Sequence, residues 1–492
     1  MVSAMSKKSL ELLFKPRNIA IFEAKEKFGY FIEGFKLHGY NLEKLFLISS
    51  TEEEISGIKC YKSIDEIPDN TIDLLILAVR RELLIQSLEE ITVKKKINFI
   101  HIFTAGTGEF DDTGAKIEKQ LKKFFDNHTN VKAIGPNCMG IYCPSGKTAY
   151  LPRFPLDDGN IGLIYHSGDL HSRAIMYGYS RYRLTFSKGA SIGNCVSLQV
   201  TDFLEYFEKD NDIDIISVYF EGFSKYQESA GKKLLTILKK MQKPILFLRG
   251  GMTDRAQSAV QTHTGSLGSD ERIWRAIFKQ TPLIEVGSSL DEMVDYMFIF
   301  HSFFKKYRDL MFEERIEYFP KSNNVLVIMW SGGLGILDTD TLTKLGLNLP
   351  LFEGKIKQRL IEIYPIKVGS LNNPLDLPWV SRSEKYVELC KAAITENIDL
   401  IIMHTNAFGF EDKERFERYY NNLKEIRDHI ESLNKILILI LADTPTKIRN
   451  DYYQLLIDDN FIVYPSIERG AKSFLKLYEF GKKLIRINKE DF

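Results

Sequence analysis

Short runs of large apolar residues, each followed by a charged amphipathic stretch, recur along the whole chain and restrict its fold more than any other feature. Runs such as DLLILAV (73–79) and KILILILA (435–442) are far shorter than the roughly 20 apolar residues that span a bilayer. They are typical of strands buried on both faces of a parallel sheet. The stretch from Glu82 to Lys96 has the pattern of a helix between two such strands. This alternation predicts an α/β protein.

Three series of these β–α units follow one another and divide the 492 residues into three predicted domains, 1–153, 154–310 and 322–492. A charged segment, residues 305–324, separates the last two series. The predicted strands lie, in chain order, at 18–22, 44–49, 73–79, 98–105, 160–168, 184–190, 213–222, 244–251 and 282–286, then in the strand–turn–helix unit 324–342, and at 400–408, 435–442 and 461–466. The sequence therefore predicts three doubly wound domains in a row, each of about the usual 100–200 residues.

Composition restricts the partners and the compartment. Lys and Arg number 66 and so do Asp and Glu, so there is no basic surplus for nucleic acid, and we expect no nucleic-acid partner. The five cysteines are scattered without a CxxC pair, which favours reduced thiols in a cytoplasmic protein and argues against a metal site. Residues 1–16 contain no apolar segment of a secretory signal, and we expect no membrane association.

Glycine and small polar residues gather directly after the predicted strands, where open α/β sheets bind their ligands. In HSGDL, Ser167 and Gly168 begin a predicted helix whose N-terminus suits an anion, although a plain N-cap serine explains them as well. SGGLG (331–335) has the same context, and a tight turn for close strand–helix packing is the alternative. The histidines of this region, His166 and His171, are more often packing or surface residues than ligands.

His263 stands in QTHTGSLGSD, a stretch of small, hydroxylated and flexible residues that suits a ring exposed on a loop. A neutral imidazole attacks phosphorus through one nitrogen while an acceptor holds the N–H of the other. Glu221, at the end of the predicted strand 213–222, is a candidate for that acceptor. On the residues alone, a solvated acid at the end of a strand is the favoured alternative for Glu221. His263 is thus a candidate nucleophile toward phosphorus.

Motifs in order along nearly the whole chain resemble those of the NDP-forming acyl-CoA synthetases, relatives of the succinyl-CoA synthetase alpha subunit. QTHTGSLGSDERIW is similar to their phosphohistidine loop. The other matching segments are LFKPRNIAIF (13–22), GIKCYKSIDEIPDNTIDLLILAV (57–79), AIGPNCMGI (133–141), SKGASIGN (187–194), VYFEGF (218–223), WSGGLGILDTDTLTKLGL (330–347) and LNNPLDL (371–377). The resemblance implies a Rossmann-like CoA-binding domain followed by two flavodoxin-like ligase domains.

The resemblance also implies a phosphoryl relay. Acyl-CoA, phosphate and NDP would be interconverted with carboxylic acid, CoA and NTP through an acyl phosphate and phospho-His263. Glu221 would hold the ring of His263, and the helix that begins at Ser167 would direct its N-terminus at the phosphohistidine. The residues implied to bind phosphate or the acyl group are Asn137, Cys138, Ser167, Gly168, Thr264 and Gly265.

A second polypeptide is implied as well. The family's nucleotide-binding half is an ATP-grasp module, often on a separate beta subunit, and we find no segment that resembles it. The resemblance therefore implies a hetero-oligomer with an ATP-grasp beta-type partner, in which Mg²⁺ and ADP or ATP are expected to bind. CoA, phosphate and the acyl-CoA or carboxylic acid would be the ligands of the present chain.

The first domain departs from the family pattern where CoA phosphate is expected. The family's first strand leads into a small Gly-containing turn, whereas Phe22 and Glu23 stand there in this chain. The carboxylate would repel a phosphate unless Lys25 or Lys27 offsets it, so Lys25 is a candidate contact for CoA. Arg80 and Arg81 stand in place of a V-P-A turn; Arg80 is a second candidate contact, and solvated side chains are the alternative. The family's SQSG carries His166 instead of Gln.

Three interpretations of this departure stay open. They are an active alpha subunit with divergent CoA contacts, a relative that uses another thiol or acyl acceptor, and a non-catalytic regulatory subunit that binds CoA or an acyl group. A nucleotide-sensing Rossmann-like module is disfavoured because GxGxxG is absent after the first predicted strand.

Overall fold

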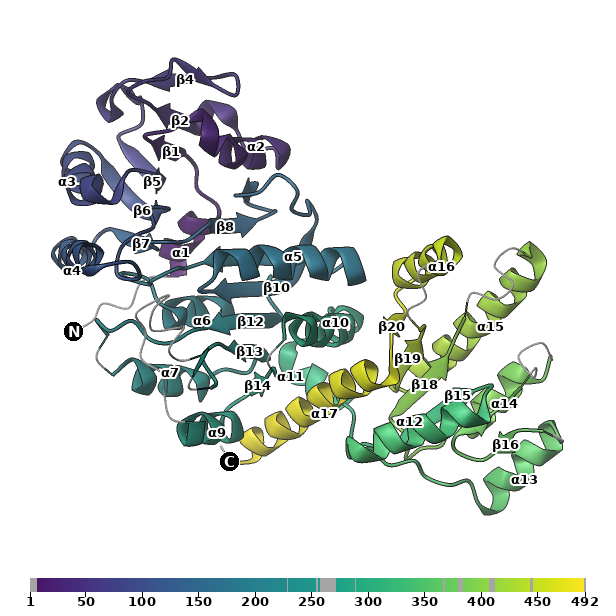
Figure 1. Ribbon diagram of the computed structural model, residues 1–492. Coiled ribbons are helices and arrows are strands. Elements are labelled where there is room, and N and C mark those ends of the chain that lie inside the picture. Colours follow the sequence, from purple (N-terminus) through teal and green to yellow (C-terminus); the bar gives the residue numbers. More distant parts are fainter. Residues whose placement is uncertain are drawn as a thin grey trace. The chain divides into compact units, whose positions relative to one another are not determined.

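The computed structural model describes residues 7–227, 229–253, 255–256, 271–287, 289–365, 368–378, 384–406, 412–442 and 446–490. His263, Thr264 and Gly265, with most of the predicted phosphohistidine loop, lie outside these residues. The chain divides into two compact units, Met1–Met297 and Phe298–Phe492. Three mainly parallel sheets are found in the described residues, two in the first unit and one in the second, which confirms the predicted α/β architecture (Figure 1).

The first sheet has the strand order β3-β4-β2-β1-β5-β6-β7 and is parallel except for the short pair β3–β4 at its edge. Its strands are β1 (Ile19–Phe22), β2 (Leu45–Ile48), β3 (Glu54–Ile55), β4 (Ile58–Tyr61), β5 (Thr71–Leu77), β6 (Lys96–Ile102) and β7 (Lys132–Ile134). Its helices are α1 (Lys7–Phe14), α2 (Gly29–Leu37), α3 (Leu84–Lys94) and α4 (Asp112–Asn127). α3 and α4 cover one face and α2 the other, as a doubly wound sheet requires (Figure 1).

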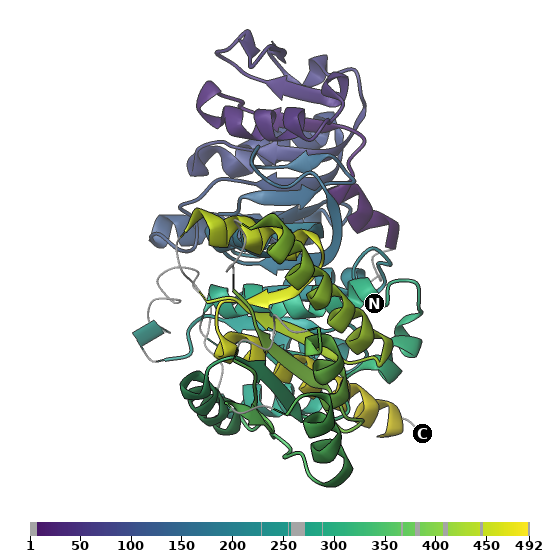
Figure 2. The same ribbon diagram turned by 90° about the vertical axis from the view of Figure 1, so that its right-hand side faces the viewer.

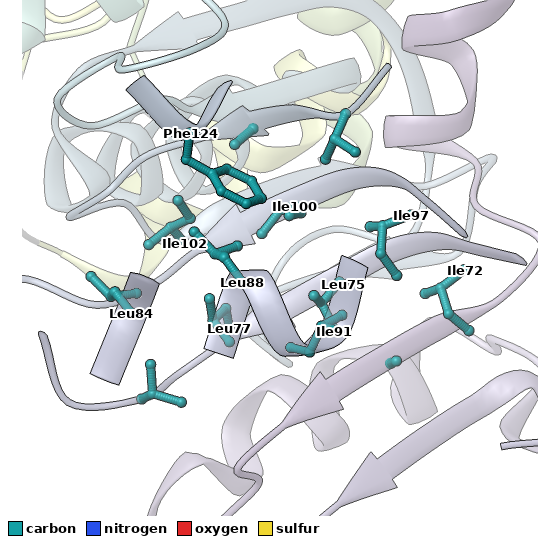
Figure 3. Packing of buried hydrophobic residues seen from close by; sticks show 14 of the residues in the cluster. Ile72, Leu75, Leu77, Leu84, Leu88, Ile91, Ile97, Ile100, Ile102 and Phe124 are labelled. Atoms are coloured by element: carbon teal, nitrogen blue, oxygen red, sulfur yellow. The ribbon is translucent and has the colours of Figure 1, made fainter. Parts of the chain in front are cut away.

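A continuous apolar layer fixes α3 and α4 on this sheet. Leu88 and Ile91 of α3, which lie three residues apart on one helix face, pack with Leu75 and Ile100 of the strands and Phe124 of α4 (Figure 3). All of these strand and α3 side chains are fully buried. Burial of one such side chain contributes about 1.5–3 kcal/mol, so this layer is a substantial part of what holds both helices on the sheet.

The second sheet, in the same unit, has the order β14-β13-β12-β10-β11-β8-β9. The hairpin β8–β9 comes from residues that precede the predicted boundary at 153. Its strand β8 pairs antiparallel with β11 and so extends the second sheet. The strands are β8 (Gly140–Cys143), β9 (Thr148–Ala149), β10 (Asp158–Tyr165), β11 (Phe186–Ser191), β12 (Ile215–Phe220), β13 (Ile245–Arg249) and β14 (Leu283–Glu285). The helices are α5 (Gly168–Tyr182), α6 (Val200–Glu208), α7 (Ala230–Leu238), α9 (Glu271–Gln280) and α10 (Leu290–Lys306), the last of which continues into the second unit.

The second unit contains the third sheet, with the order β16-β17-β15-β18-β19-β20. α12 packs on α17 and α14 packs on α15, with helices on both faces of the sheet (Figures 1 and 2). The strands are β15 (Val325–Met329), β16 (Ser370–Leu371), β17 (Leu375–Asp376), β18 (Leu400–His404), β19 (Ile436–Ile440) and β20 (Ile462–Tyr464). The helices are α11 (Phe312–Arg315), α12 (Gly332–Lys344), α13 (Gly354–Ile363), α14 (Tyr386–Ala393), α15 (Lys413–Ser432), α16 (Lys447–Asp458) and α17 (Ile467–Glu490).

Among the described helices, none is both long enough and apolar enough to cross a membrane.

Two histidines are enclosed in the interior of the first unit. His101 of β6 directs Nε2 at the carbonyl of Cys138 (3.0 Å), and His171 of α5 directs Nδ1 at the hydroxyl of Tyr150 (2.6 Å). Burial lowers the pKa of His101 to about 4 and that of His171 to about 3. Both rings are therefore neutral at neutral pH. His171 is a packing residue, as the sequence suggested.

We predict that truncating the first core layer destabilises the chain. Leu88→Ala should lower the free energy of unfolding by about 2–5 kcal/mol, because it leaves a cavity against β5 and β6. Val93→Ala is the matched control, since Val93 lies on the same helix and is 87% exposed. Chemical denaturation followed by tryptophan fluorescence measures both; equal losses in the two variants would contradict this packing.

Stability should also fall on mild acidification. The folded pKa values of His101 and His171 lie below the unfolded value, so the unfolded chain binds protons that the folded chain excludes. Their contribution is complete above about pH 6.5 and is lost as the pH falls toward 4. Between pH 8 and pH 5 we expect a loss of about 2 kcal/mol for each ring. His166, whose pKa burial also lowers to about 4, adds a third such contribution. His101→Phe, which takes no proton, should therefore lose about 2 kcal/mol less than the wild type over this range; an unchanged unfolding midpoint between pH 8 and pH 5 in the wild type would refute the assignment.

Candidate active site

A cavity of about 670 Å³ opens in Met1–Met297 beside the carboxyl ends of strands from both sheets. The residues that line it follow β5, β6, β10, β11 and β12 or lie in the turn between β7 and β8. Open α/β sheets bind ligands at such edges because the loops there are free to converge. The lining residues are Ala78, Val79, Arg80, Arg81, Glu82, Phe103, Thr104, Ala105, Asn137, Cys138, Met139, His166, Ser167, Gly168, Asp169, Gly193, Asn194 and Glu221.

The cavity gathers most of the described residues that the sequence suggested for the site. Six of them line it, from four separate loops: Arg80, Asn137, Cys138, Ser167, Gly168 and Glu221. Lys25 does not line this cavity; it is exposed and directly precedes the 3₁₀ turn Glu26–Phe28. His263, Thr264 and Gly265 lie outside the described residues. Sequence reasoning missed the contributions of His166 and Asn194.

Backbone hydrogen bonds join the turn before β8 to the loop after β11 and so hold the two sheet edges together. Gly135 donates its N–H to the carbonyl of Ile192 (3.0 Å). The N–H of Asn194 donates in return to the carbonyl of Pro136 (3.0 Å). Gly193, at φ +57°, fits between them because a Cβ there would stand 2.2 Å from the Pro136 oxygen. Only glycine permits this backbone-to-backbone contact.

Asn137 and Cys138 follow in the same turn. Asn137 has the left-handed φ of +60° and donates its N–H to the carbonyl of Thr104 (2.9 Å), which ties the turn to the end of β6. The Cys138 thiol points at the carbonyl of Ile102 (3.7 Å). Burial raises the pKa of the Cys138 thiol, so it stays protonated at neutral pH and is a poor nucleophile. Cys138 therefore lines the cavity without acting as a nucleophile.

The N-terminus of α5 opens into the cavity. Ser167 is its N-cap, and its Oγ accepts the N–H of Leu170 (3.3 Å). Gly168 permits close approach of the Met139 side chain, since a Cβ at Gly168 would meet Met139 Cγ at 2.3 Å. The remaining free N–H groups of this first turn and the helix dipole favour an anion here.

Two arginines in the loop after β5 have different surroundings. Arg81 is held by the Asp111 carboxylate (2.9 and 3.0 Å), by Glu82 (2.9 Å) and by the carbonyl of Gly106 (2.8 Å). Arg80 lines the cavity, and its guanidinium makes no ion pair or hydrogen bond within the part of the chain that the structure describes. Arg80 is thus a cation available to a bound anion.

A polar network fixes the loop after β6. The Asn194 side chain donates to Thr107 Oγ1 (3.1 Å), Glu109 Oε2 (2.7 Å) and Glu118 Oε2 (2.9 Å). Lys225, in the loop after Glu221, pairs with the other oxygen of Glu118 (3.5 Å). The loops after β6, β11 and β12 are therefore connected through the buried carboxylate of Glu118.

Glu221 and His166 form the remaining wall. Glu221 follows β12 and is buried, contrary to the solvated acid that the residues alone favoured. Its backbone N–H donates to Nδ1 of His166 (3.2 Å). Burial lowers the pKa of His166 to about 4, against the opposing effect of the Glu221 carboxylate. The signal for His166 in the sequence was its place in the strand-end motif HSG.

The turn after β1 has a left-handed backbone conformation at a residue that is not glycine. Glu23 has φ +58°, a conformation that favours glycine, and its carboxylate accepts a hydrogen bond from Ser50 Oγ (3.2 Å). The altered turn therefore places a carboxylate where the family resemblance implies a glycine whose backbone N–H groups are accessible to CoA phosphate.

The Gly-rich turn of the second unit is a weaker candidate. A Cβ on Gly332, at the start of α12, would lie 3.2 Å from the carboxylate of Asp376, and burial raises the pKa of Asp376. A carboxylate at this helix N-terminus competes with any other anion. Across the described residues of both units, no cluster of three His, Cys, Asp or Glu side chains is arranged to hold a metal ion.

Two domain families match the first unit. The CoA binding domain matches residues 22–144, and the succinyl-CoA ligase like flavodoxin domain matches residues 158–300. A solved structure titled dinucleotide forming acetyl-coenzyme A synthetase 1 of Ca. Korarchaeum cryptofilum, in complex with phosphate and ADP, superposes with a TM-score of 0.78 over 98% of both chains. At 21% identity this likeness shows the fold.

Curated relatives are more similar in sequence. The alpha subunit of acetate–CoA ligase [ADP-forming] I of Pyrococcus furiosus is 27% identical over 96% of this chain and 98% of its own. The acetate–CoA ligase [ADP-forming] of Methanocaldococcus jannaschii is 32% identical, and the chain covers 49% of that longer protein. The alpha subunit of acetate–CoA ligase [ADP-forming] II of Pyrococcus furiosus is 31% identical over 80% of this chain and 81% of its own. The chain therefore belongs to the family of the ADP-forming acetate–CoA ligase alpha subunits, among the NDP-forming acyl-CoA synthetases.

Proposed function

We propose that this chain is the alpha-type subunit of an NDP-forming acyl-CoA synthetase that interconverts acyl-CoA, phosphate and NDP with carboxylic acid, CoA and NTP. The observation that carries the proposal is the cavity, in which a helix N-terminus, an available arginine and a buried carboxylate converge in a chain of this family. These groups suit a thioester, a phosphate and a transferred phosphoryl group.

The proposed reaction has two steps in this chain. In the first, a phosphate oxygen adds to the thioester carbonyl, the C–S bond breaks, and the CoA sulfur leaves with the proton of the phosphate. In the second, a nitrogen of His263 attacks the phosphorus of the acyl phosphate, and the carboxylate leaves. The N–H groups at Ser167 and Gly168 bind the phosphate. Glu221 accepts the N–H of one His263 ring nitrogen, which orients the ring and fixes the tautomer whose other nitrogen is unprotonated and nucleophilic. Thr264 and Gly265 of the same loop would bind the phosphoryl oxygens.

A partner subunit completes the proposed reaction. Phospho-His263 would donate its phosphoryl group to NDP on an ATP-grasp beta-type subunit, which would also bind Mg²⁺. Two facts support a hetero-oligomer: similar relatives are named alpha subunits, and the Methanocaldococcus jannaschii relative is about twice as long as the matched region. The five free cysteines, all buried, support the cytoplasm as the compartment.

CoA would be held through its phosphates. Arg80 lines the cavity, and Lys25 stands beside the turn after β1, so both are proposed as phosphate contacts. The Glu23 carboxylate opposes the same phosphates, which supports divergent CoA contacts over the usual Gly-containing turn.

The relay predicts a covalent adduct. The full chain incubated with acetyl-CoA and phosphate should gain one phosphoryl group by intact mass at neutral pH, and acid should remove it. His263→Ala should show no adduct, and Glu221→Gln should form it more slowly at unchanged CoA affinity. An adduct that persists in His263→Ala would contradict the assignment of the nucleophile.

The proposed CoA contact predicts a selective loss of affinity. Arg80→Ala should raise the Kd of CoA by about tenfold or more, since a hydrogen bond to a charged group contributes about 1.5–3 kcal/mol. The Kd of pantetheine, which lacks the phosphates, should stay unchanged. Lys119→Ala, an exposed cation on α4, is the control. Calorimetry that finds equal losses for CoA and pantetheine would place Arg80 away from the phosphates.

A further inference from the structure

The ring of His166 has one defined orientation and one defined tautomer. A backbone N–H is always a donor, so the bond from Glu221 requires an unprotonated Nδ1 on His166. A neutral ring then carries its proton on Nε2. The ring also packs at 5.2 Å against Phe220, the last residue of β12. His166 is therefore a fixed N–H donor.

The Nε2 side of this ring is available to a ligand. Within the described part of the chain, no protein group hydrogen-bonds to Nε2 of His166, and the residue lines the cavity. The bonded atom Nδ1 faces the backbone of Glu221 at the wall. The donor Nε2–H is thus left for the contents of the cavity.

The other polar groups of the cavity suit charged ligand atoms. Arg80 is a permanent cation, and the α5 N-terminus after Ser167 suits phosphate oxygens. His166 differs because it is a neutral donor. Burial keeps its pKa at about 4, so it stays neutral throughout the neutral range. A neutral donor matches an uncharged carbonyl that becomes negative only during reaction.

We propose that His166 is a catalytic residue whose Nε2–H donates a hydrogen bond to the acyl carbonyl oxygen of the thioester. The proposal rests on the proposed function. When phosphate adds to the carbonyl carbon, the C=O π electron pair moves to this oxygen, and the hydrogen bond strengthens on the developing negative charge. The pair returns as the C–S bond breaks, and the CoA sulfur leaves with the proton of the phosphate. His166 transfers no proton at any point.

The test observes the carbonyl directly. Acetyl-CoA with ¹³C at the carbonyl, the thioester that the relatives' names indicate, is bound to the full chain without phosphate and recorded by isotope-edited infrared spectroscopy. The wild-type complex should show the C=O band below its frequency in free acetyl-CoA. His166→Ala should return the band to the free value. His166→Gln retains an amide N–H donor that is less well positioned, so its band should lie between those of the wild type and His166→Ala. His38→Gln, a buried histidine bonded to the carbonyls of Gly34 and Pro155, should match the wild type.

Kinetics give the second readout. The loss of one donor to a developing oxyanion lowers kcat by about 10²–10³-fold, so His166→Ala should show this drop in acyl phosphate formation with little change in KM. His166→Gln should restore part of kcat. A purely structural role would lower thermal stability without moving the carbonyl band.

The outcomes separate the two proposals. A carbonyl band at the same frequency in wild type, His166→Gln and His166→Ala, with acetyl-CoA bound to each by calorimetry, overturns the role of His166 and leaves the synthetase function standing. A wild-type chain that does not bind acetyl-CoA contradicts the synthetase function, and the role of His166 with it.

Discussion

The backbone contact between the turn Gly135–Asn137 and the loop Ile192–Asn194 is the constraint on which the site depends. Each sheet of the first unit presents a carboxyl edge, but neither edge alone carries all of the site groups. The reciprocal N–H···O bonds hold the two edges together, and Gly193 packs against the carbonyls of Pro136 and Asn137. A side chain at Gly193 would clash with the Pro136 carbonyl, and the two bonds hold together loops that line the cavity.

The same contact explains how the cavity's polar groups acquire different chemistry. Burial against the joined edges keeps the Cys138 thiol protonated and the His166 ring neutral, because a low dielectric disfavours their charged forms. Arg80 lies at the rim, where its charge stays solvated. One cavity therefore holds a permanent cation at its rim, a helix dipole and a neutral donor, a combination suited to a CoA thioester and phosphate.

The sequence predicted the strands well and the site only in part, for physical reasons. Apolar runs such as 73–79 mark buried strands locally, because burial on both faces leaves no polar positions. The difference between Arg80 and Arg81 depends on Asp111, 30 residues away, which periodicity cannot locate. The sequence favours a packing or surface role for His166, because a lone histidine carries no local signal of its tautomer or of a cavity beside it. The positive charges of Lys25 and Arg80 made both candidate contacts for CoA phosphate, yet Arg80 lines the cavity and Lys25 does not.

The most direct test of the account is isotope exchange between labelled CoA and acetyl-CoA, catalysed by this chain with and without phosphate. The account predicts phosphate-dependent exchange, since acyl phosphate formation in the cavity releases CoA reversibly. It also predicts that exchange survives in His263→Ala, because the first step precedes phosphorylation of that ring. Exchange that is absent from both proteins, or that proceeds equally without phosphate, would contradict the claim that this cavity converts a thioester into an acyl phosphate.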